Sequence, residues 1–519
     1  MRLRGLLAIT VISGLALGAT ATSTALGATD GRPNVLVIQT DDQTLADLDV
    51  MPNVRSLITS RGVKFTSAVT PFAICCPSRA AMMTGAYPHN NGVSANFPPA
   101  GGFVAWEKQA TSSIGAWLKD AGYHTIHIGK YINGYGWYNK PTRNTPIGWS
   151  EWFGSADPST YQMYGYRVNH DGGQTRYGVF QVENPKKYQT TVYTQIAQGA
   201  IRRQAANPSP FYMQIAFLAP HVETLPLRTT INPRDVDMDD TSQSSAIQSI
   251  PPRPHPRDRN KIPNLPLDTM ASPSFNEADT SDKGTYVAGL PSLTKEEIQD
   301  LIEDNRQRKR SLMSVDRGVA RLVATLKQTG QLDNTIIVFM GDNGYMLGQH
   351  RIKKGKYFPY EPSLRIPLIV AGPGVTPGEV NSSLVSLIDV APTVLDFAGV
   401  TPTGRQPDGV SLKPVLTGTG PATPRTMLLE SGPQQAPNGD TLPLFNGVRT
   451  PHWSWWRYED GSEELYDLVA DPFQINSRAS DPAYRRTRAA LIREWQRLKD
   501  CSGASCQVRT TRIPKPARR

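Results

Sequence analysis

The sequence predicts an α/β protein in which a mainly parallel β-sheet lies between layers of helices. Short apolar runs at residues 35–38, 123–128, 211–218 and 335–340 are typical of strands that are buried on both faces. Helical patterns lie between these runs, and strands that alternate with helices form a parallel sheet covered by helices. The chain has 519 residues, of which 39% are hydrophobic, so it is long enough for a large domain and a smaller one and too apolar for a disordered protein.

The first residues have the pattern of a secretory signal peptide, which we expect to span residues 1–28 and to be cleaved. Arg2 and Arg4 precede an apolar stretch at residues 6–17, and small residues follow it. This stretch is shorter than the roughly 18–20 residues that cross a membrane, so an N-terminal anchor is the less favoured alternative. We therefore expect a protein without a transmembrane anchor, either secreted or retained at the cell surface.

The chain has a modest positive charge. Its 55 Lys and Arg residues exceed its 45 Asp and Glu residues, which gives a formal charge of +10. Such a surplus favours anionic partners, although it is also common in proteins for which charge serves only solubility. We expect no nucleic-acid partner.

The 4 cysteines fall into two pairs. Cys501 and Cys506 flank Ser-Gly-Ala-Ser, and in an oxidising compartment this spacing predicts a local disulfide. Cys75 and Cys76 are adjacent, where a disulfide would be strained, so at least one of them requires a different explanation.

The clearest helix prediction covers residues 311–328, and Gly330 stands where a glycine often ends a helix. Apolar residues recur there at helical spacing: Leu312, Val315, Val319, Leu322, Val323 and Leu326.

Two shifts in composition suggest how the chain is organised. Residues 226–283 are rich in Pro, Asp, Ser, Thr and Asn, which predicts a long insertion of surface loops, either a lid that faces a substrate or a mobile excursion. Residues 401–439 are again rich in Pro and Gly. We therefore place a large domain at residues 29–420 and a small C-terminal domain with a basic tail at residues 421–519.

The C-terminal domain is predicted to combine strands with one helix. Residues 445–450 and 453–458 are strand-like, and a helix opens at Asp481-Pro482. Tyr484, Leu491, Trp495 and Leu498 share one face of that helix, which indicates an α+β domain.

Polar residues follow two of the predicted strands of the large domain. Thr40-Asp41-Asp42 ends the first strand, and Gly341-Asp342-Asn343-Gly344 ends the strand at 335–340. Ligands of open parallel sheets bind outside the carboxyl ends of the strands, and carboxylates so close together require a neutralising cation. Four oxygen donors favour Ca²⁺ or Mg²⁺. The alternative is that these residues only cap turns.

Cationic groups follow two other strands. Lys130 comes after residues 123–128, and His221 comes after residues 211–218. A site with a divalent ion, a lysine and a histidine is equipped to bind a tetrahedral oxyanion and to protonate a leaving oxygen. The alternatives are a solvated Lys130 and a His221 that belongs to the core.

A short motif at residues 75–85 is predicted to form a helix that begins near Pro77 and ends at Gly85. Cys75 would then lie at the positive N-terminus, with Arg79 one turn along. This position would depress the pKa of the thiol, so a thiolate nucleophile is conceivable. No general base accompanies it in the sequence, which disfavours an ordinary cysteine hydrolase.

This motif resembles the signature of type I sulfatases, which belong to the alkaline phosphatase superfamily. The likeness covers nearly the whole chain after the leader, and its other segments are residues 34–42, 341–344, 387–393, 464–468 and 471–472. The resemblance implies a large domain with a mixed, mainly parallel sheet between helices and a small C-terminal α+β domain with an antiparallel sheet.

The resemblance also implies a modified nucleophile and a metal. In this family a formylglycine-generating enzyme oxidises the first cysteine of the motif to formylglycine (3-oxoalanine), which here is Cys75, with Pro77 and Arg79 as recognition elements. One hydroxyl of the hydrated aldehyde would attack the sulfate sulfur, and the other would later expel sulfate. Ca²⁺, with Mg²⁺ as the alternative, would be bound by Asp41, Asp42, Cys75, Asp342 and Asn343.

Four further residues receive roles from the resemblance. Arg79, Lys130 and Lys356 would balance charge on the sulfate oxygens, and His221, alone or with Lys356, would protonate the departing alcohol. Lys356 is preferred to Lys353 and Lys354 because Tyr-Glu follows it at the spacing of the family. The alternative is that this basic cluster is a solvated loop.

One position departs from many arylsulfatases, which carry a histidine two residues after the lysine that corresponds to Lys130. Ile132 occupies that place here, so the residue that drives sulfate elimination is not identified, and the neighbouring Asn133 is a candidate for substrate binding. The sequence from Gly129 to Gly136 is instead similar to N-acetylglucosamine-6-sulfatases and extracellular heparan endosulfatases. That branch shares Cys-Cys-Pro-Ser-Arg, which leaves Cys76 as a buried thiol within the motif.

The resemblance therefore implies a sulfuric ester hydrolase whose leading substrates are amino-sugar sulfates of the glycosaminoglycan type. Aryl sulfates and other carbohydrate sulfates remain open. A phosphate or phosphonate ester hydrolase on the same scaffold and a non-enzymatic protein that binds sulfated glycans with an unmodified Cys75 are the competing hypotheses.

Overall fold

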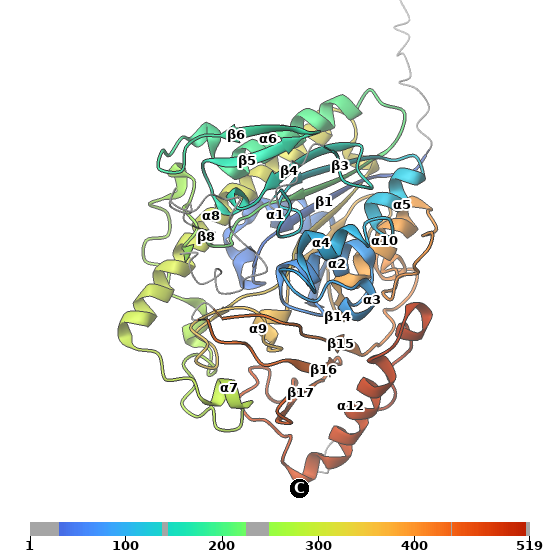
Figure 1. Ribbon diagram of the computed structural model, residues 1–519. Coiled ribbons are helices and arrows are strands. Elements are labelled where there is room, and N and C mark those ends of the chain that lie inside the picture. The colour runs from blue at the N-terminus through green and yellow to red at the C-terminus, as the bar shows by residue number, and fades with distance from the viewer. Residues whose placement is uncertain (1–30, 137–143, 225–248, 437–438, 515–519) are drawn as a thin grey trace, which may run out of the picture.

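The computed structural model describes residues 31–136, 144–224, 249–436 and 439–514. The predicted signal peptide and the first part of the insertion, residues 225–248, lie outside the described residues. The centre of the protein is a mixed, ten-stranded sheet (Figure 1). Its strands, in spatial order, are β14 (Glu379–Ser386), β2 (Gly62–Val69), β13 (Leu368–Ala371), β10 (Thr335–Gly341), β1 (Asn34–Thr40), β7 (Phe211–Ala216), β3 (His124–Gly129), β4 (Glu151–Ala156), β5 (Tyr166–His170) and β6 (Gly173–Tyr177).

The four strands predicted from apolar runs are neighbours at the centre of this sheet. β10, β1, β7 and β3 pair in parallel in that order, and every residue of β1, β7 and β10 is buried. β7 ends at Ala216, two residues before the predicted end of this strand at residue 218. The prediction of a mixed, mainly parallel sheet is confirmed: β13 and β5 run opposite to the other eight strands.

Helices cover both faces of the sheet (Figure 1). One face buries Leu36 and Ile38 of β1 under α1 (Pro52–Leu57), α6 (Gln189–Gln204) and α8 (Lys295–Gln328). The other face buries Val35 and Val37 of β1 under a second group of helices. These are α2 (Cys75–Thr84), α4 (Gly102–Glu107), α5 (Ile114–Asp120), α10 (Val390–Ala398) and α11 (Lys413–Leu416). Among the described residues, no helix is both long and apolar enough to cross a membrane.

The helix predicted at residues 311–328 is α8, but it begins 16 residues earlier and is 34 residues long. Its first turns are strongly charged, so they lack the apolar periodicity that defines its second half. A capping box marks the true start: the Thr294 side chain accepts from the Glu297 backbone N–H, and the Glu297 carboxylate accepts from the Thr294 N–H.

The described part of the insertion, residues 249–283, is largely irregular. It contains β9 (Ser249–Ile250), which pairs with β8 (Glu223–Thr224), and two 3₁₀ turns at Pro256–Asp258 and Asp268–Ala271. It also places charged groups in the interior: Asp258 pairs with Arg317 of α8, and Glu277 pairs with Lys283. This segment is therefore packed against the large domain.

A second sheet lies C-terminal to the large one. Its strands, in order, are β15 (Met427–Leu429), β16 (Phe445–Arg449), β17 (Trp453–Tyr458) and β18 (Glu463–Asp467), and all their pairings are antiparallel, as expected. The predicted helix begins as a 3₁₀ turn at Pro482–Tyr484 and continues as α12 (Arg485–Leu498), which lies beside this sheet (Figure 1). Leu491 of α12 packs in the same apolar cluster as Val448 and Trp455 of the sheet. The predicted disulfide between Cys501 and Cys506 is present.

Candidate active site

The carboxyl ends of the central strands meet at one buried site. Asp41 and Asp42 follow β1, and Asp342 and Asn343 follow β10, its parallel neighbour. The backbone N–H groups of Asp42 and Asn343 donate to Asp342 Oδ1 over 3.0 and 2.8 Å, and Asn343 Nδ2 donates to Asp42 Oδ1 over 2.7 Å. Asp42 has a φ of 64°, a conformation that non-glycine residues rarely adopt and that here turns its carboxylate into the site.

Charge and burial act in opposite directions on these acids. Burial raises the pKa of Asp41, but Lys130, His221 and Arg79 outweigh that effect, and the net pKa lies well below its usual range. Burial raises the pKa of Asp342 to about 6, and the neighbouring Asp41 contributes to the increase. The pKa values of these two acids therefore differ: cations lower the pKa of Asp41, whereas burial is the main effect on the pKa of Asp342.

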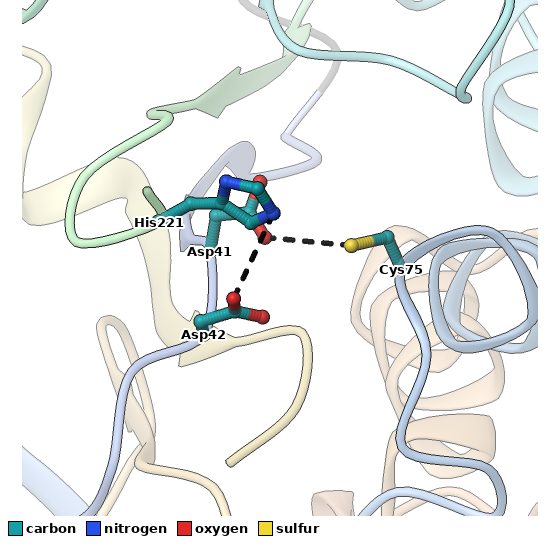
Figure 2. A group of neighbouring side chains, drawn as sticks. All are labelled: Asp41, Asp42, Cys75 and His221. Carbon is teal, nitrogen blue, oxygen red and sulfur yellow. Dashed lines mark hydrogen bonds and ion pairs between the residues drawn. The ribbon is translucent and has the colours of Figure 1, made fainter. Parts of the chain in front are cut away.

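The donor set fits a hard divalent cation. Asp41, Asp42, Cys75 and His221 each point a candidate ligand atom toward the same point, and these atoms lie within 4.8 Å of one another (Figure 2). The buried amide oxygen of Asn343 has no hydrogen-bond partner among the described residues, so an unused oxygen donor also lies at this edge. Carboxylate and amide oxygens at this density are the ligands that Ca²⁺ and Mg²⁺ prefer. Asp342 differs from Asn343 because its side-chain oxygens already accept hydrogen bonds: Arg79 Nε donates to Asp342 Oδ2 over 2.9 Å.

Cys75 lies at the N-terminus of α2, as predicted, although the helix begins at Cys75 itself, two residues before Pro77; Gly85 ends the helix with a φ of 66°. The Cys75 side chain is buried, and its sulfur lies 3.7 Å from Asp41 Oδ1 (Figure 2). The expected depression of its pKa is wrong. Burial raises the pKa of the Cys75 thiol to about 11, because it outweighs Lys130 and Lys356. An unmodified Cys75 is therefore a neutral thiol, which is a poor nucleophile.

Three predicted cations surround Cys75 and the acids. Lys130 Nζ lies 2.5 Å from Asp41 Oδ2 and 3.4 Å from Cys75 Sγ. Lys356 Nζ lies 2.8 Å from Cys75 Sγ and also pairs with Asp42. Arg79, which is buried, lies between Asp342 and Asp41, 3.5 Å from the latter.

Both lysines remain charged in this setting. Burial is the largest single effect and lowers the pKa of each lysine, but the neighbouring anionic groups together, led by Asp41 for Lys130 and by Asp42 for Lys356, outweigh it, so both net pKa values lie above the usual range. The site therefore presents two positive charges next to Cys75.

The structure separates Lys356 from the two lysines before it. Lys353 pairs with Glu297 at 3.4 Å and Lys354 pairs with Asp304 at 2.7 Å, and both are more than a third exposed. Only Lys356 among these three contacts Cys75. The choice made from the Tyr-Glu spacing thus agrees with the geometry, although the catalytic role of Lys356 stays a prediction.

His221 follows β7 and faces Asp42, with 3.7 Å between Nε2 and Asp42 Oδ2 (Figure 2). Its Nδ1 donates to the Val222 carbonyl over 2.8 Å, which fixes the ring and leaves Nε2 toward the acids. Burial lowers the pKa of His221 to about 4, more than the carboxylates raise it. In this state the imidazole is neutral at pH 7.

Two residues that the sequence did not reveal complete the site. Arg308 of α8 donates to the carbonyl oxygens of Asp42, at 2.5 Å, and Pro220, at 3.2 Å, so it joins the ends of β1 and β7. The ring of Tyr161, at the end of the 3₁₀ turn Ser159–Tyr161 after β4, lies 4.7 Å from Lys130 Nζ and 5.2 Å from the His221 ring. The capping box of α8 could have extended the predicted helix back over Arg308, but no sequence pattern indicated that Arg308 or Tyr161 reaches the site.

The departure at residue 132 has a clear structural setting. Ile132 is buried in the apolar cluster beneath the sheet and supplies no polar group. Cys76 is buried, as expected, and its sulfur accepts from the Asn133 backbone N–H over 3.2 Å. Asn133 is thereby held beside the first turn of α2.

The segment after Lys356 is anchored to the C-terminal sheet. Tyr360 donates to the buried carboxylate of Glu464 over 3.0 Å, and Tyr458 and Tyr466 donate to the same carboxylate over 3.1 and 2.5 Å. Glu361 forms a paired contact with Arg449, with both N···O distances at 3.1 Å. The second sheet therefore helps to position the loop that carries Lys356.

Comparisons with known proteins match this site and fold. A family model described as Sulfatase matches residues 33–400, and one described as N-sulphoglucosamine sulphohydrolase, C-terminal, matches residues 348–501. The chain is 32% identical to the N-acetylglucosamine-6-sulfatase of Homo sapiens, across 92% of this chain and 86% of that protein. It is 29% identical to an arylsulfatase of Volvox carteri, across 92% of this chain and 76% of that protein.

The fold matches a solved structure of a protein in complex with its substrate D-glucosamine-2-N,6-O-disulfate. The TM-score is 0.64 at 24% identity, and the match covers 90% of this chain and 97% of that one. The large mixed sheet with its C-terminal antiparallel sheet is thus the alkaline phosphatase-like fold of sulfatases. The chain belongs to the sulfatase family and is a sulfuric ester hydrolase.

Proposed function

We propose that the protein is a secreted, metal-dependent sulfatase that hydrolyses sulfate esters of carbohydrates through a formylglycine made from Cys75. N-acetylglucosamine 6-sulfate and related glycosaminoglycan sulfates are the leading substrates. The reason is that the human relative is an N-acetylglucosamine-6-sulfatase and that its similarity to this protein extends over most of both chains. The single observation that carries the proposal is the position of Cys75, whose buried sulfur contacts Lys130, Lys356 and Asp41 at the end of the central strands.

The oxidised Cys75 would supply what the thiol lacks. A thiol with a pKa of about 11 is not ionised at pH 7, whereas a hydrated aldehyde offers two hydroxyl groups. We propose that the formylglycine-generating enzyme is the partner that carries out this conversion, with Pro77 and Arg79 as recognition elements. Secretion is proposed from the leader pattern at residues 1–28.

We propose that Ca²⁺, with Mg²⁺ as the alternative, is bound by Asp41, Asp42, Asp342, Asn343 and the oxidised Cys75. When bound, the ion would neutralise the carboxylates and polarise an oxygen of the sulfate group. The amide oxygen of Asn343, which has no hydrogen-bond partner within the described ranges, and the convergence of Asp41, Asp42 and Cys75 support this assignment.

The residues around Cys75 would divide the remaining tasks. Lys130, Lys356 and Arg79 would orient the sulfate oxygens and balance the charge that develops on them. His221 would donate a proton from Nε2 to the departing alcohol oxygen. Although its pKa is about 4 in the free site, the negative charge of a bound sulfate ester beside it would raise its proton affinity.

We further propose that the chain comprises a catalytic domain at residues 29–420, with its insertion at 226–283, and a small C-terminal domain at 421–519. The start of the second sheet at Met427 supports this boundary.

The test is to express the protein with a formylglycine-generating enzyme and to measure both the modification and turnover. Mass spectrometry of the peptide that spans Cys75 is expected to show the aldehyde, and matched aryl esters are expected to be hydrolysed faster as sulfates than as phosphates. Cys75→Ala should abolish turnover with the fold intact, whereas Cys76→Ala, at the adjacent buried thiol, should retain the aldehyde and the activity. A clear preference for phosphate would replace the sulfatase proposal with a phosphoryl hydrolase, and an unmodified, inactive protein would support a glycan-binding role.

A further inference from the structure

Tyr161 reaches the candidate active site from a fifth strand end. β4 is parallel to β3, so its carboxyl end lies at the same edge of the sheet as Lys130. The ring of Tyr161 lies against the Lys130 ammonium at 4.7 Å and the His221 ring at 5.2 Å, so it touches two residues with proposed roles.

The hydroxyl of Tyr161 is unused in the free protein. Its oxygen is buried and has no hydrogen-bond partner among the described residues. Buried polar groups are nearly always paired, because an unpaired one destabilises the folded protein, so this hydroxyl requires an explanation. Burial raises the pKa of Tyr161 well above its usual value, which keeps the phenol protonated and able to donate.

Asn133 provides a second unpaired group in the neighbouring segment. Its side-chain oxygen is buried and has no partner among the described residues. Two hydrogen bonds join the two segments: the Gly134 N–H donates to Asp157 Oδ2 over 2.6 Å, and the Asp157 N–H donates to the Tyr135 carbonyl over 2.8 Å. The bond from the Asn133 N–H to Cys76 Sγ holds Asn133 beside the residue that follows Cys75.

The chemistry of these two groups differs from that of the cations around Cys75. Lys130, Lys356 and Arg79 only donate hydrogen bonds, which suits the acceptor oxygens of a sulfate group. The amide oxygen of Asn133 only accepts hydrogen bonds, so it needs a donor, and the sulfate group of a substrate has none. A sugar hydroxyl donates and accepts at once, which matches an amide oxygen together with a phenol.

We propose that Tyr161 and Asn133 form a subsite that binds a hydroxyl group of the alcohol portion of the substrate, so that the enzyme favours sugar sulfates over aryl sulfates. This inference rests on the proposed function. It assigns the preference for a sugar substrate to the segments after β3 and β4, and it adds a hydrogen-bonding contact for the alcohol that is released when the sulfate ester is cleaved.

Tyr161→Phe isolates the hydroxyl, because the ring that contacts Lys130 and His221 is kept. The measurement is the ratio of kcat/KM for N-acetylglucosamine 6-sulfate to kcat/KM for 4-nitrophenyl sulfate, whose leaving group carries no sugar hydroxyl. We expect Tyr161→Phe and Asn133→Ala each to lower this ratio about tenfold, the effect of one lost hydrogen bond. Thermal melting verifies that each variant is folded.

Tyr164→Phe is the matched control. The Tyr164 hydroxyl is also buried, with no hydrogen-bond partner in the part of the chain that the structure describes, but its ring packs in the core against Tyr188 and Arg253. This variant should leave the ratio unchanged. The subsite is refuted if both site variants keep the wild-type ratio, if Tyr164→Phe lowers it equally, or if the wild type hydrolyses only the aryl sulfate. A wild type that hydrolyses phosphate esters but neither sulfate would instead overturn the proposed function, and the subsite with it.

Discussion

Replacement of Lys356 by methionine tests the site directly, because Lys353 and Lys354 provide controls within the same loop. Lys356→Met keeps most of the side-chain volume and removes the ammonium that lies 2.8 Å from Cys75 Sγ and pairs with Asp42. We expect a large loss of activity, since a buried positive charge would vanish from the place where sulfate charge develops.

The expected magnitude follows from the geometry. The Lys356 side chain is only 11% exposed, so water screens its charge poorly. Two unit charges about 4 Å apart interact by about 4 kcal/mol at the effective dielectric typical of such sites. Loss of one preorganised donor to a developing oxyanion lowers turnover by about 10²–10³, which corresponds to about 3–4 kcal/mol. The two values agree, so we expect kcat/KM to fall at least about a hundredfold.

The assay is hydrolysis of 4-nitrophenyl sulfate by the matured enzyme, with circular dichroism to verify the fold. Lys353→Met and Lys354→Met should change kcat/KM by less than about twofold, because these lysines are partly exposed and pair with Glu297 and Asp304 rather than with Cys75. Lys356→Arg, which keeps the charge, should recover part of the loss. If a folded Lys356→Met retained more than a third of the wild-type kcat/KM, or if a control variant lost as much, the assignment of Lys356 would be wrong.

Three further predictions concern the metal, pH and the disulfide. Removal of divalent ions with EDTA should abolish turnover and lower the melting temperature, and Ca²⁺ should restore both; Asp42→Asn should weaken the rescue, and full activity in EDTA would contradict the metal site. Burial against the Trp152 ring lowers the pKa of His127 to about 3, so the stability that it contributes is complete above pH 6.5 and is lost as pH falls toward 3. Between pH 7 and 4.5 this loss is about 2–3 kcal/mol, and urea unfolding of His127→Phe should show a smaller decrease than the wild type; equal decreases would refute this origin. Replacement of Cys501 and Cys506 by serine opens a small loop and should lower the free energy of unfolding by no more than about 2 kcal/mol without affecting turnover, which a loss of activity would contradict.

The central sheet could be predicted because its strands are continuous apolar runs. β1 and β10 are buried along their whole length, so their sequences carry no polar interruption. The polar residues that end each strand are then the ones that meet at the sheet edge, which explains why Asp41, Asp342 and Lys130 were located in advance. The start of α8 was missed because its first turns are covered with charges rather than marked by an apolar stripe.

The remaining site features depend on three-dimensional packing. Tyr161 lies in a short turn after β4, and nothing in the local sequence shows that its ring reaches Lys130. The pKa of Cys75 was predicted in the wrong direction because the helix N-terminus is visible in the sequence, whereas complete burial of the thiol is not. The direction of a pKa shift can therefore be predicted only when the burial of the group is known as well as its position on a helix.

The carboxylate of Glu464 links the end of the chain to its middle, and this has a consequence for shortened forms of the gene. Every residue with a proposed role in bond cleavage is encoded before codon 357, so a product that stopped near residue 420 would contain all of them. It would nevertheless lack Glu464 and Arg449, the partners of Tyr360 and Glu361 just beyond Lys356. Such a product would contain every reactive group, but the loop that carries Lys356 would lack its contacts with the C-terminal sheet. A late stop codon should therefore be as harmful as the loss of a residue within the site.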